Sequence, residues 1–197
     1  VDIAASNEPS LTGNLLDYVT LGFTHIVPKG LDHILFVLGL FFLRPEWRPL
    51  LAQVTTFTFA HSITLALGLY GVLEVSPRIV EPLIALSIVY VAVENIFTDR
   101  LKPWRPAVVF AFGLLHGLGF AGILQEVGLA RDNYVSALIG FNIGVELGQL
   151  TVIVAAWLAT AMMFGRKPWY RTRIAVPASV MIAVIGLYWT IDRVWLS

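Results

Sequence analysis

The sequence predicts an all-α, polytopic membrane bundle of about six transmembrane helices, preceded by an amphipathic or re-entrant helix. Two observations carry this prediction: 57% of the 197 residues are hydrophobic and only 13% are charged, and the mean hydropathy is +0.79. A soluble domain is about 45–50% apolar and about one quarter charged. The composition therefore excludes a disordered chain and disfavours a water-soluble one. The zero net charge indicates no nucleic-acid partner.

Long apolar segments separated by Pro, Arg and Lys give the candidate spans. A spanning helix needs roughly 20 mostly apolar residues, whereas barrel strands alternate in runs of about ten. These segments are too long and too uniformly apolar for such strands. The predicted spans are residues 30–43, 49–72, 78–98, 105–127, 134–164 and 172–195. We expect residues 1–29 to form an extracytoplasmic segment and residues 30–197 to form the transmembrane domain.

The distribution of basic residues predicts the orientation of the chain. The loops after the first, third and fifth spans hold nine of the thirteen Lys and Arg residues. Basic loops face the cytoplasm, so both termini are predicted to be extracytoplasmic. Trp47, Trp104 and Trp169 lie beside these three loops, as an interfacial aromatic belt requires.

The N-terminal segment contains a predicted amphipathic helix at residues 11–27, in which polar side chains interrupt the apolar ones (Asn14, Asp17, Thr20 and Thr24). It could lie in the membrane interface or enter the membrane as a re-entrant helix. An outside N-terminus beginning at Val1 is the arrangement expected if a signal peptide, with or without an extracytoplasmic domain, has been removed.

All four histidines lie in or at the mouth of apolar segments. An ionisable side chain at mid-bilayer costs about 2.5–3.5 kcal/mol, so each one needs a reason. Pro28 and Gly30 should break the helix after His25, so that His25 can fold back toward Asp32 and His33. Because neighbouring helical residues point about 100° apart, we expect His33 to be a metal ligand. Asp32 is either a second ligand or the partner that orients an imidazole.

The other two histidines are predicted near the middle of their spans. His61 has Thr58 one turn before it and Ser62 directly after it. His116 has three glycines within one turn, which allow close helix approach. The competing interpretation is that each group has a purely structural role. Asp32 would then cap a helix, His61 would form an interhelical hydrogen bond, and the glycines around His116 would allow close helix contact.

Two carboxylates complete the candidate set. Glu146 lies in the middle of the fifth span, on one helical stripe with Asn142 and Gln149. Glu94 lies near the cytoplasmic end of the third span, where a long side chain can also reach the interface at little cost. The chain has no cysteine, and imidazole and carboxylate without thiolate favour nickel, cobalt or zinc over copper(I). The predicted metal ligands are His25, Asp32, His33, His61, His116 and Glu146, supported by Thr58, Asn142, Gln149 and Glu94.

As an ordered set, the segments around these residues closely resemble the HupE/UreJ family. The matching segments are Gly22–Ile26, Gly30–Phe36, Phe57–Leu65, Val93–Asn95, His116–Ala121 and Phe141–Gln149. The resemblance covers about residues 20–150 and is closer to the branch with an extracytoplasmic N-terminal region. It implies a nickel or cobalt permease in a bacterial inner membrane. The family's first-span element resembles His-Pro-x-x-Gly-x-Asp-His, whereas here Ile26 follows His25.

The leading hypothesis is therefore a permease for a divalent metal ion, in contact with the lipid bilayer. The sequence has no Walker-type glycine-rich motif, so no nucleotide partner is expected. The alternative is an intramembrane zinc-dependent hydrolase that uses Ser62 and Asp32 beside a histidine-bound zinc ion. A non-catalytic membrane partner or metal sensor is the third hypothesis, and the sequence leaves a homo-oligomer open.

Overall fold

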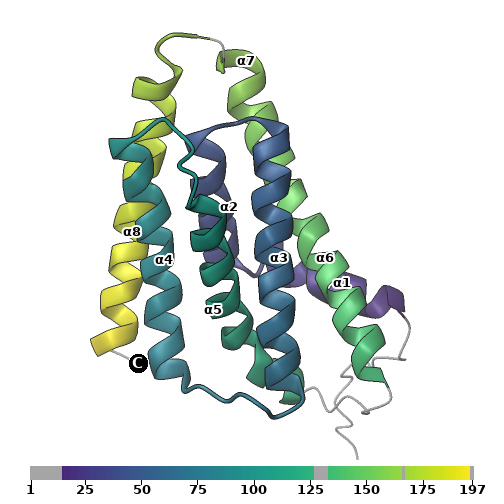
Figure 1. Cartoon of the computed structure of the whole chain (residues 1–197). Helices are drawn as coiled ribbons and strands as arrows, with labels where there is room; N and C mark the ends of the chain where they lie inside the picture. The colour runs from purple at the N-terminus through teal and green to yellow at the C-terminus, as the bar shows by residue number, and fades with distance from the viewer. Residues whose placement is uncertain (1–14, 127–132, 166, 196–197) are drawn as a thin grey trace, which may run out of the picture.

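The computed structural model describes residues 15–126, 133–165 and 167–195, and this part of the chain is almost entirely helical (Figure 1). Two π-helical segments, η2 (Trp157–Ala161) and η3 (Arg171–Ala175), adjoin α7 and α8. The α-helices are α1 (Leu15–Ile26), α2 (Leu31–Leu43), α3 (Trp47–Leu69), α4 (Pro77–Phe97), α5 (Arg105–Glu126), α6 (Tyr134–Ala156), α7 (Met162–Phe164) and α8 (Val176–Trp195).

Within this part of the chain, four helical segments are long and apolar enough to cross a membrane: Trp47–Leu69, Pro77–Phe97, Tyr134–Phe164 and Arg171–Trp195. A fifth is added if α1 and α2 count as one broken span, since the pair bends by 71°. The apolar stretch Arg105–Phe120 of α5 is shorter. The membrane bundle is thus confirmed. By this measure the number of spans is four or five and not six, because α2 has only 13 residues and the apolar stretch of α5 is short.

Helix α2 lies in the middle of the bundle, between the pair α3–α5 and the pair α4–α8 (Figure 1). Its residues are almost all apolar, and Phe36, Val37, Leu40 and Phe41 are at most 1% exposed. The outward faces of α6 and α8 instead carry exposed large apolar side chains, as lipid-facing helices do. A polar side chain on α2 therefore faces protein and not lipid.

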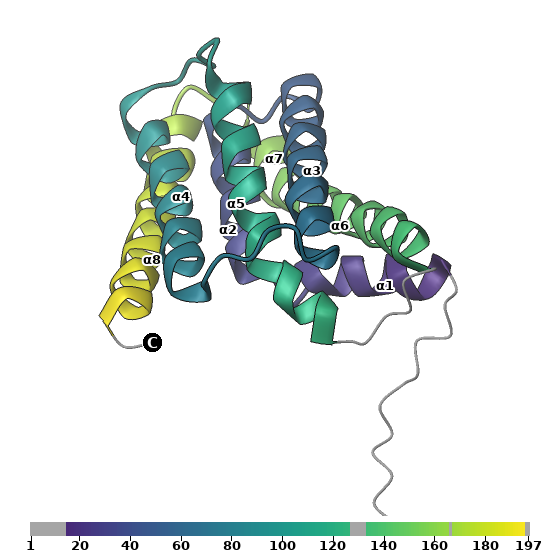
Figure 2. The same cartoon turned by 60° about the horizontal axis from the view of Figure 1, so that its bottom comes forward.

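Helix α1 runs across one end of the bundle and packs along α6 (Figure 2). The contact is close: a Cβ at Gly22 would overlap the carbonyl oxygen of Phe141. We call this the site end of the bundle; α2 and α4 begin there, and α3 and α8 end there (Figure 1). The predicted helix at residues 11–27 is confirmed from Leu15 to Ile26, and residues 11–14, Asn14 among them, lie outside the described residues.

Candidate metal centre

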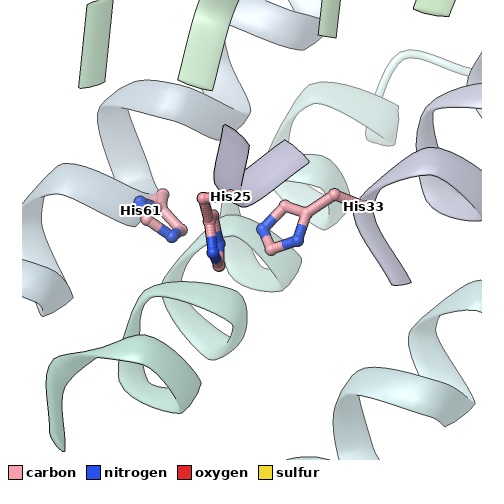
Figure 3. Close-up of side chains that lie close together, drawn as sticks. All are labelled: His25, His33 and His61. Carbon is pink, nitrogen blue, oxygen red and sulfur yellow. The ribbon is translucent and has the colours of Figure 1, made fainter. Parts of the chain in front are cut away.

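Three imidazole rings from three helices meet near the site end of the bundle (Figure 3). His25 lies in the last turn of α1, His33 in the first turns of α2 and His61 on α3. One ring nitrogen from each lies within 4.8 Å of the others. The ring centroids of His25 and His33 are 4.8 Å apart, and those of His33 and His61 are 5.8 Å apart.

The fourth histidine, His116 of α5, adjoins this group. Its ring centroid lies 4.9 Å from that of His33, and the side chain is buried. We call His25, His33, His61 and His116 the histidine cluster. The structure thus brings together four side chains that are spread over 92 positions of the sequence, from residue 25 to residue 116.

Each imidazole of the histidine cluster has a buried Nε2 atom without a hydrogen-bond partner among the described residues. Buried polar atoms are nearly always hydrogen-bonded, so four such atoms in one place are unusual. An unprotonated Nε2 with nothing bound to it is the donor that imidazole offers to a metal ion. The cluster therefore has the donor set of a metal site.

Hydrogen bonds from the other ring nitrogen orient two of these rings. His116 Nδ1 lies 2.8 Å from the carbonyl oxygen of Phe112, to which it can only donate. His61 Nδ1 lies 3.4 Å from Oδ1 of Asn142, whose amide nitrogen donates to Leu138 O at 2.7 Å. Both contacts place the proton on Nδ1 and leave the Nε2 lone pair free, the arrangement that metal-binding histidines share.

Two glycines allow the helices to approach closely enough to form the cluster. A Cβ at Gly30 would overlap the carbonyl oxygen of His25, so the α1–α2 turn closes only with glycine there. A Cβ at Gly117 would overlap Thr64 Oγ1 and the carbonyl oxygen of His61. Close approach of α5 to α3, and with it the position of His116, thus depends on Gly117.

A cavity of about 480 Å³ gives access to the cluster from the site end. His25, His33 and His116 line it, together with apolar side chains of α1, α4 and α5. Four charged side chains also line it: Lys29, Asp32, Glu81 and Arg193. An ion approaching the imidazoles would therefore meet both signs of charge.

Asp32 pairs with Arg193 of α8 in this cavity. Arg193 Nη2 donates to Asp32 Oδ2 at 3.0 Å, and Nη1 lies 3.0 Å from Oδ1. Asp32 lies within the regular first turn of α2. Of the two predicted roles for Asp32, neither is seen directly, since its carboxylate contacts Arg193. The sequence does not predict a role for Arg193 in this cavity. Arg193 lies near the end of the last span, where a basic residue is also expected in a loop.

Glu146 lies apart from the histidine cluster, in a groove of about 640 Å³ between α3 and α6. Thr55 Oγ1 donates to Glu146 Oε1 at 2.6 Å. Gln149 on the same stripe accepts a hydrogen bond of 3.0 Å from Thr58. The predicted polar stripe of α6 therefore exists and faces α3, but only Asn142 reaches a histidine. Ser62 also lines this groove and not the histidine cavity.

A layer of aromatic rings lies one helical turn from the cluster, toward the opposite end of the bundle. Its members are Phe36, Phe57 and Phe112, and the Phe36 centroid lies 5.0 Å from that of Phe57 and 5.9 Å from that of Phe112. His116 touches this layer, with centroids 4.9 Å from Phe57 and 5.3 Å from Phe36. The layer separates the histidine cavity from the opposite end of the bundle.

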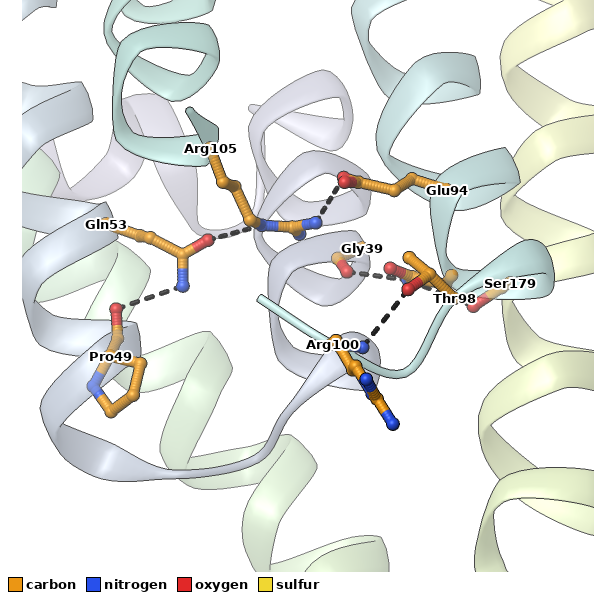
Figure 4. Close-up of polar contacts among 9 residues, drawn as sticks. Gly39, Pro49, Gln53, Glu94, Thr98, Arg100, Arg105 and Ser179 are labelled. Carbon is orange, nitrogen blue, oxygen red and sulfur yellow. Dashed lines mark hydrogen bonds and ion pairs between the residues drawn. The ribbon is translucent and has the colours of Figure 1, made fainter. Parts of the chain in front are cut away.

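A buried polar network lies on the side of the phenylalanine layer away from the cluster. Figure 4 shows the side chains of this network. Arg105 forms an ion pair with Glu94 and donates to Gln53 Oε1 at 2.7 Å. Gln53 in turn donates to the carbonyl oxygen of Pro49 at 3.0 Å. A second cavity, of about 200 Å³, reaches Gln53 and Arg105 from the opposite end. Glu94 is therefore an ion-paired internal residue and not one that reaches the interface.

The comparison with known families agrees with this architecture. The sequence model of the family described as HupE / UreJ protein matches residues 3–193. No curated protein and no solved structure matches the chain.

Proposed function

Because this chain belongs to the HupE/UreJ family, we propose that it is a permease for a divalent transition-metal ion of the nickel or cobalt class. The observation that carries the proposal is the cluster of four unpartnered Nε2 atoms, of which those of His25, His33 and His116 belong to residues that line one cavity. His25, His33, His61 and His116 would bind the ion as substrate. Asp32 contributes a carboxylate at the mouth of the same cavity.

The chemistry of the cluster supports this class of ion. Imidazole nitrogen is a borderline ligand that suits nickel, cobalt and zinc, and the chain has no cysteine to offer a thiolate. Protons compete with the metal for Nε2, so binding should weaken as the pH falls. We propose nickel or cobalt and not zinc because the HupE/UreJ family is associated with nickel and cobalt.

Two cavities separated by the phenylalanine layer support a route through the bundle. In the orientation we propose, the site end and both termini are extracytoplasmic, and the histidines receive the ion from outside. Residues 1–29 then belong to the extracytoplasmic side and residues 30–197 to the transmembrane domain. A membrane potential that is negative inside favours inward movement by about 2.3 kcal/mol per charge per 100 mV.

The geometry gives no support to the hydrolase hypothesis. Ser62 donates to the carbonyl oxygen of Thr58 at 2.7 Å and lines the α3–α6 groove. Asp32 is paired with Arg193. The nucleophile and the acid–base group that this hypothesis requires thus lie at different places.

Uptake of Ni²⁺, Co²⁺ and Zn²⁺ into proteoliposomes tests the proposal. We expect uptake of Ni²⁺ or Co²⁺ by the parent protein and a loss of at least tenfold in His61→Ala and His116→Ala, since each removes one ligand. Thr151→Ala is the matched control, because Thr151 is an exposed polar residue on α6. Absent flux combined with tightly retained zinc would refute the permease and favour the hydrolase.

A further inference from the structure

The ion pair between Asp32 and Arg193 differs from the ion pair between Arg105 and Glu94 in its exposure and its position. The Arg105 and Glu94 side chains are only 3% and 10% exposed, whereas those of Arg193 and Asp32 are 20% and 27% exposed. Separating an ion pair costs less when water can reach the two charges than when both are buried. The partly exposed Asp32–Arg193 pair should therefore open at a lower cost than the Arg105–Glu94 pair. Arg193 and Asp32 also line the histidine cavity, which Arg105 and Glu94 do not.

Arg193 is fixed on its own side of the cavity by contacts besides Asp32. Its Nη1 atom donates to the carbonyl oxygen of Glu81 at 3.2 Å, and its guanidinium lies 5.4 Å from the centroid of the Trp189 ring. Asp32, by contrast, has both carboxylate oxygens on Arg193, with Oδ2 3.0 Å from Nη2 and Oδ1 3.0 Å from Nη1, and no hydrogen bond to another described residue holds its side chain. The carboxylate can therefore change partner while the guanidinium stays in place.

We propose that Arg193 is a positioning residue that competes with the metal ion for Asp32, and so sets how tightly the cavity captures a dication. The proposal rests on the proposed metal-binding function. Asp32 lines the same cavity as His25, His33 and His116, so its carboxylate can turn within that cavity from Arg193 toward an ion at the cluster. The guanidinium then remains in the cavity mouth as an uncompensated positive charge, which opposes capture and favours release.

Double-mutant analysis of Ni²⁺ binding by the full chain in nanodiscs tests the competition. Arg193→Gln should lower the Kd for Ni²⁺ about fivefold, the effect expected from freeing one partly exposed ion-pair partner. In an Asp32→Asn background the same substitution should change the Kd much less, because the contested carboxylate is gone. Arg193→Lys keeps the charge but loses the two-point contact, so it should fall between the parent and Arg193→Gln.

Two controls separate competition from a purely structural role. Arg173→Gln removes the same charge at the opposite end of the bundle and should leave the Kd unchanged. The absorption of bound Co²⁺ reports ligand number and geometry, and should differ between the parent and Asp32→Asn but not between the parent and Arg193→Gln if Asp32 joins the ion. A structural clamp between α2 and α8 would lower thermal stability in Arg193→Gln without tightening Ni²⁺ binding.

The outcomes distinguish this inference from the function on which it rests. If the parent protein binds none of Ni²⁺, Co²⁺ and Zn²⁺, the proposed function is refuted. The proposed competition between Arg193 and the ion for Asp32 is then refuted as well. If the parent binds Ni²⁺ and both Arg193 variants bind it equally or less tightly, only the competition is refuted. If Arg193→Gln fails to fold, Arg193→Lys against the parent decides between tighter and unchanged binding.

Discussion

Asn142 determines which nitrogen of His61 faces the histidine cluster. Its Nδ2 atom is held by Leu138 O, so Oδ1 is the atom that His61 Nδ1 meets. We expect Asn142→Ala to raise the Kd for Ni²⁺ about 10- to 100-fold, since partners that orient a metal-binding imidazole have effects of that size. Asn142→Asp retains an acceptor and should bind more tightly than Asn142→Ala. Calorimetric titration of both variants measures this, and equal affinities would contradict the assigned tautomer.

Glu94 neutralises Arg105 inside the bundle. Glu94→Ala leaves a buried guanidinium without a counter-ion, which should lower stability by about 3–5 kcal/mol. Glu46→Ala is the control, because Glu46 pairs with Arg44 at the surface and such pairs contribute about 0–1 kcal/mol. Thermal unfolding in detergent should show a large loss for Glu94→Ala alone. Similar melting temperatures for the two variants would show that Arg105 reaches water.

The residues of the candidate site could largely be predicted from their type and position in the sequence. Which side chains contact one another could not. Histidines in apolar segments are conspicuous because burial makes them costly, and the structure brings all four together. Arg193 and Asp32 lie 161 positions apart, and no spacing rule connects residues at that separation. Glu146 was grouped with the histidines by its depth in the membrane, but depth does not specify which neighbouring helix a side chain faces.

At the scale of helices, the approach of α5 to α3 depends on Gly117. Gly117→Ala should push these helices apart and displace His116, because the new methyl group would meet Thr64 and the backbone of His61. Overpacking of this kind costs about 1–3 kcal/mol. Metal affinity should fall together with stability, as measured by Ni²⁺ titration and thermal unfolding of the same samples.

Gly119 provides the matched control on the same helix. A Cβ there would lie 2.8 Å from Cδ1 of Ile84, the far end of a flexible side chain that can move aside. Gly119→Ala should therefore retain both stability and Ni²⁺ binding. Equal losses in the two variants would indicate a general intolerance of α5 and not a specific contact at Gly117.

The positions of the long helices could be predicted to within a few residues. Which face of each helix packs against protein could not. Apolar segments bounded by Pro and basic residues gave α3, α4 and α6 because burial in lipid requires about 20 apolar residues. The hydrophobic pattern of such helices is nearly uniform, so it does not reveal which side faces protein. The glycines at 30 and 117 mark the close contacts, but a glycine alone does not identify its neighbour.

At the scale of the whole molecule, the absence of cysteine allows a direct test of orientation, since each introduced thiol is the only one in the chain. Arg78 begins α4 at the site end, whereas Arg100 and Lys167 lie at the opposite end. A membrane-impermeant maleimide should label Arg78→Cys in intact cells. Arg100→Cys and Lys167→Cys should react only after permeabilisation, and the reverse pattern would invert the proposed direction of transport.

The packing of α1 on α6 has a consequence for biogenesis. His25 depends on α1, and α1 fits into glycine-lined contacts with α6, where a Cβ at Gly144 would overlap the backbone oxygen of Val19. A nascent chain that has inserted only as far as α5 already carries all four imidazoles, but it lacks the surface that holds the first of them. The complete histidine cluster can therefore form only after α6 has been synthesised and has packed against α1.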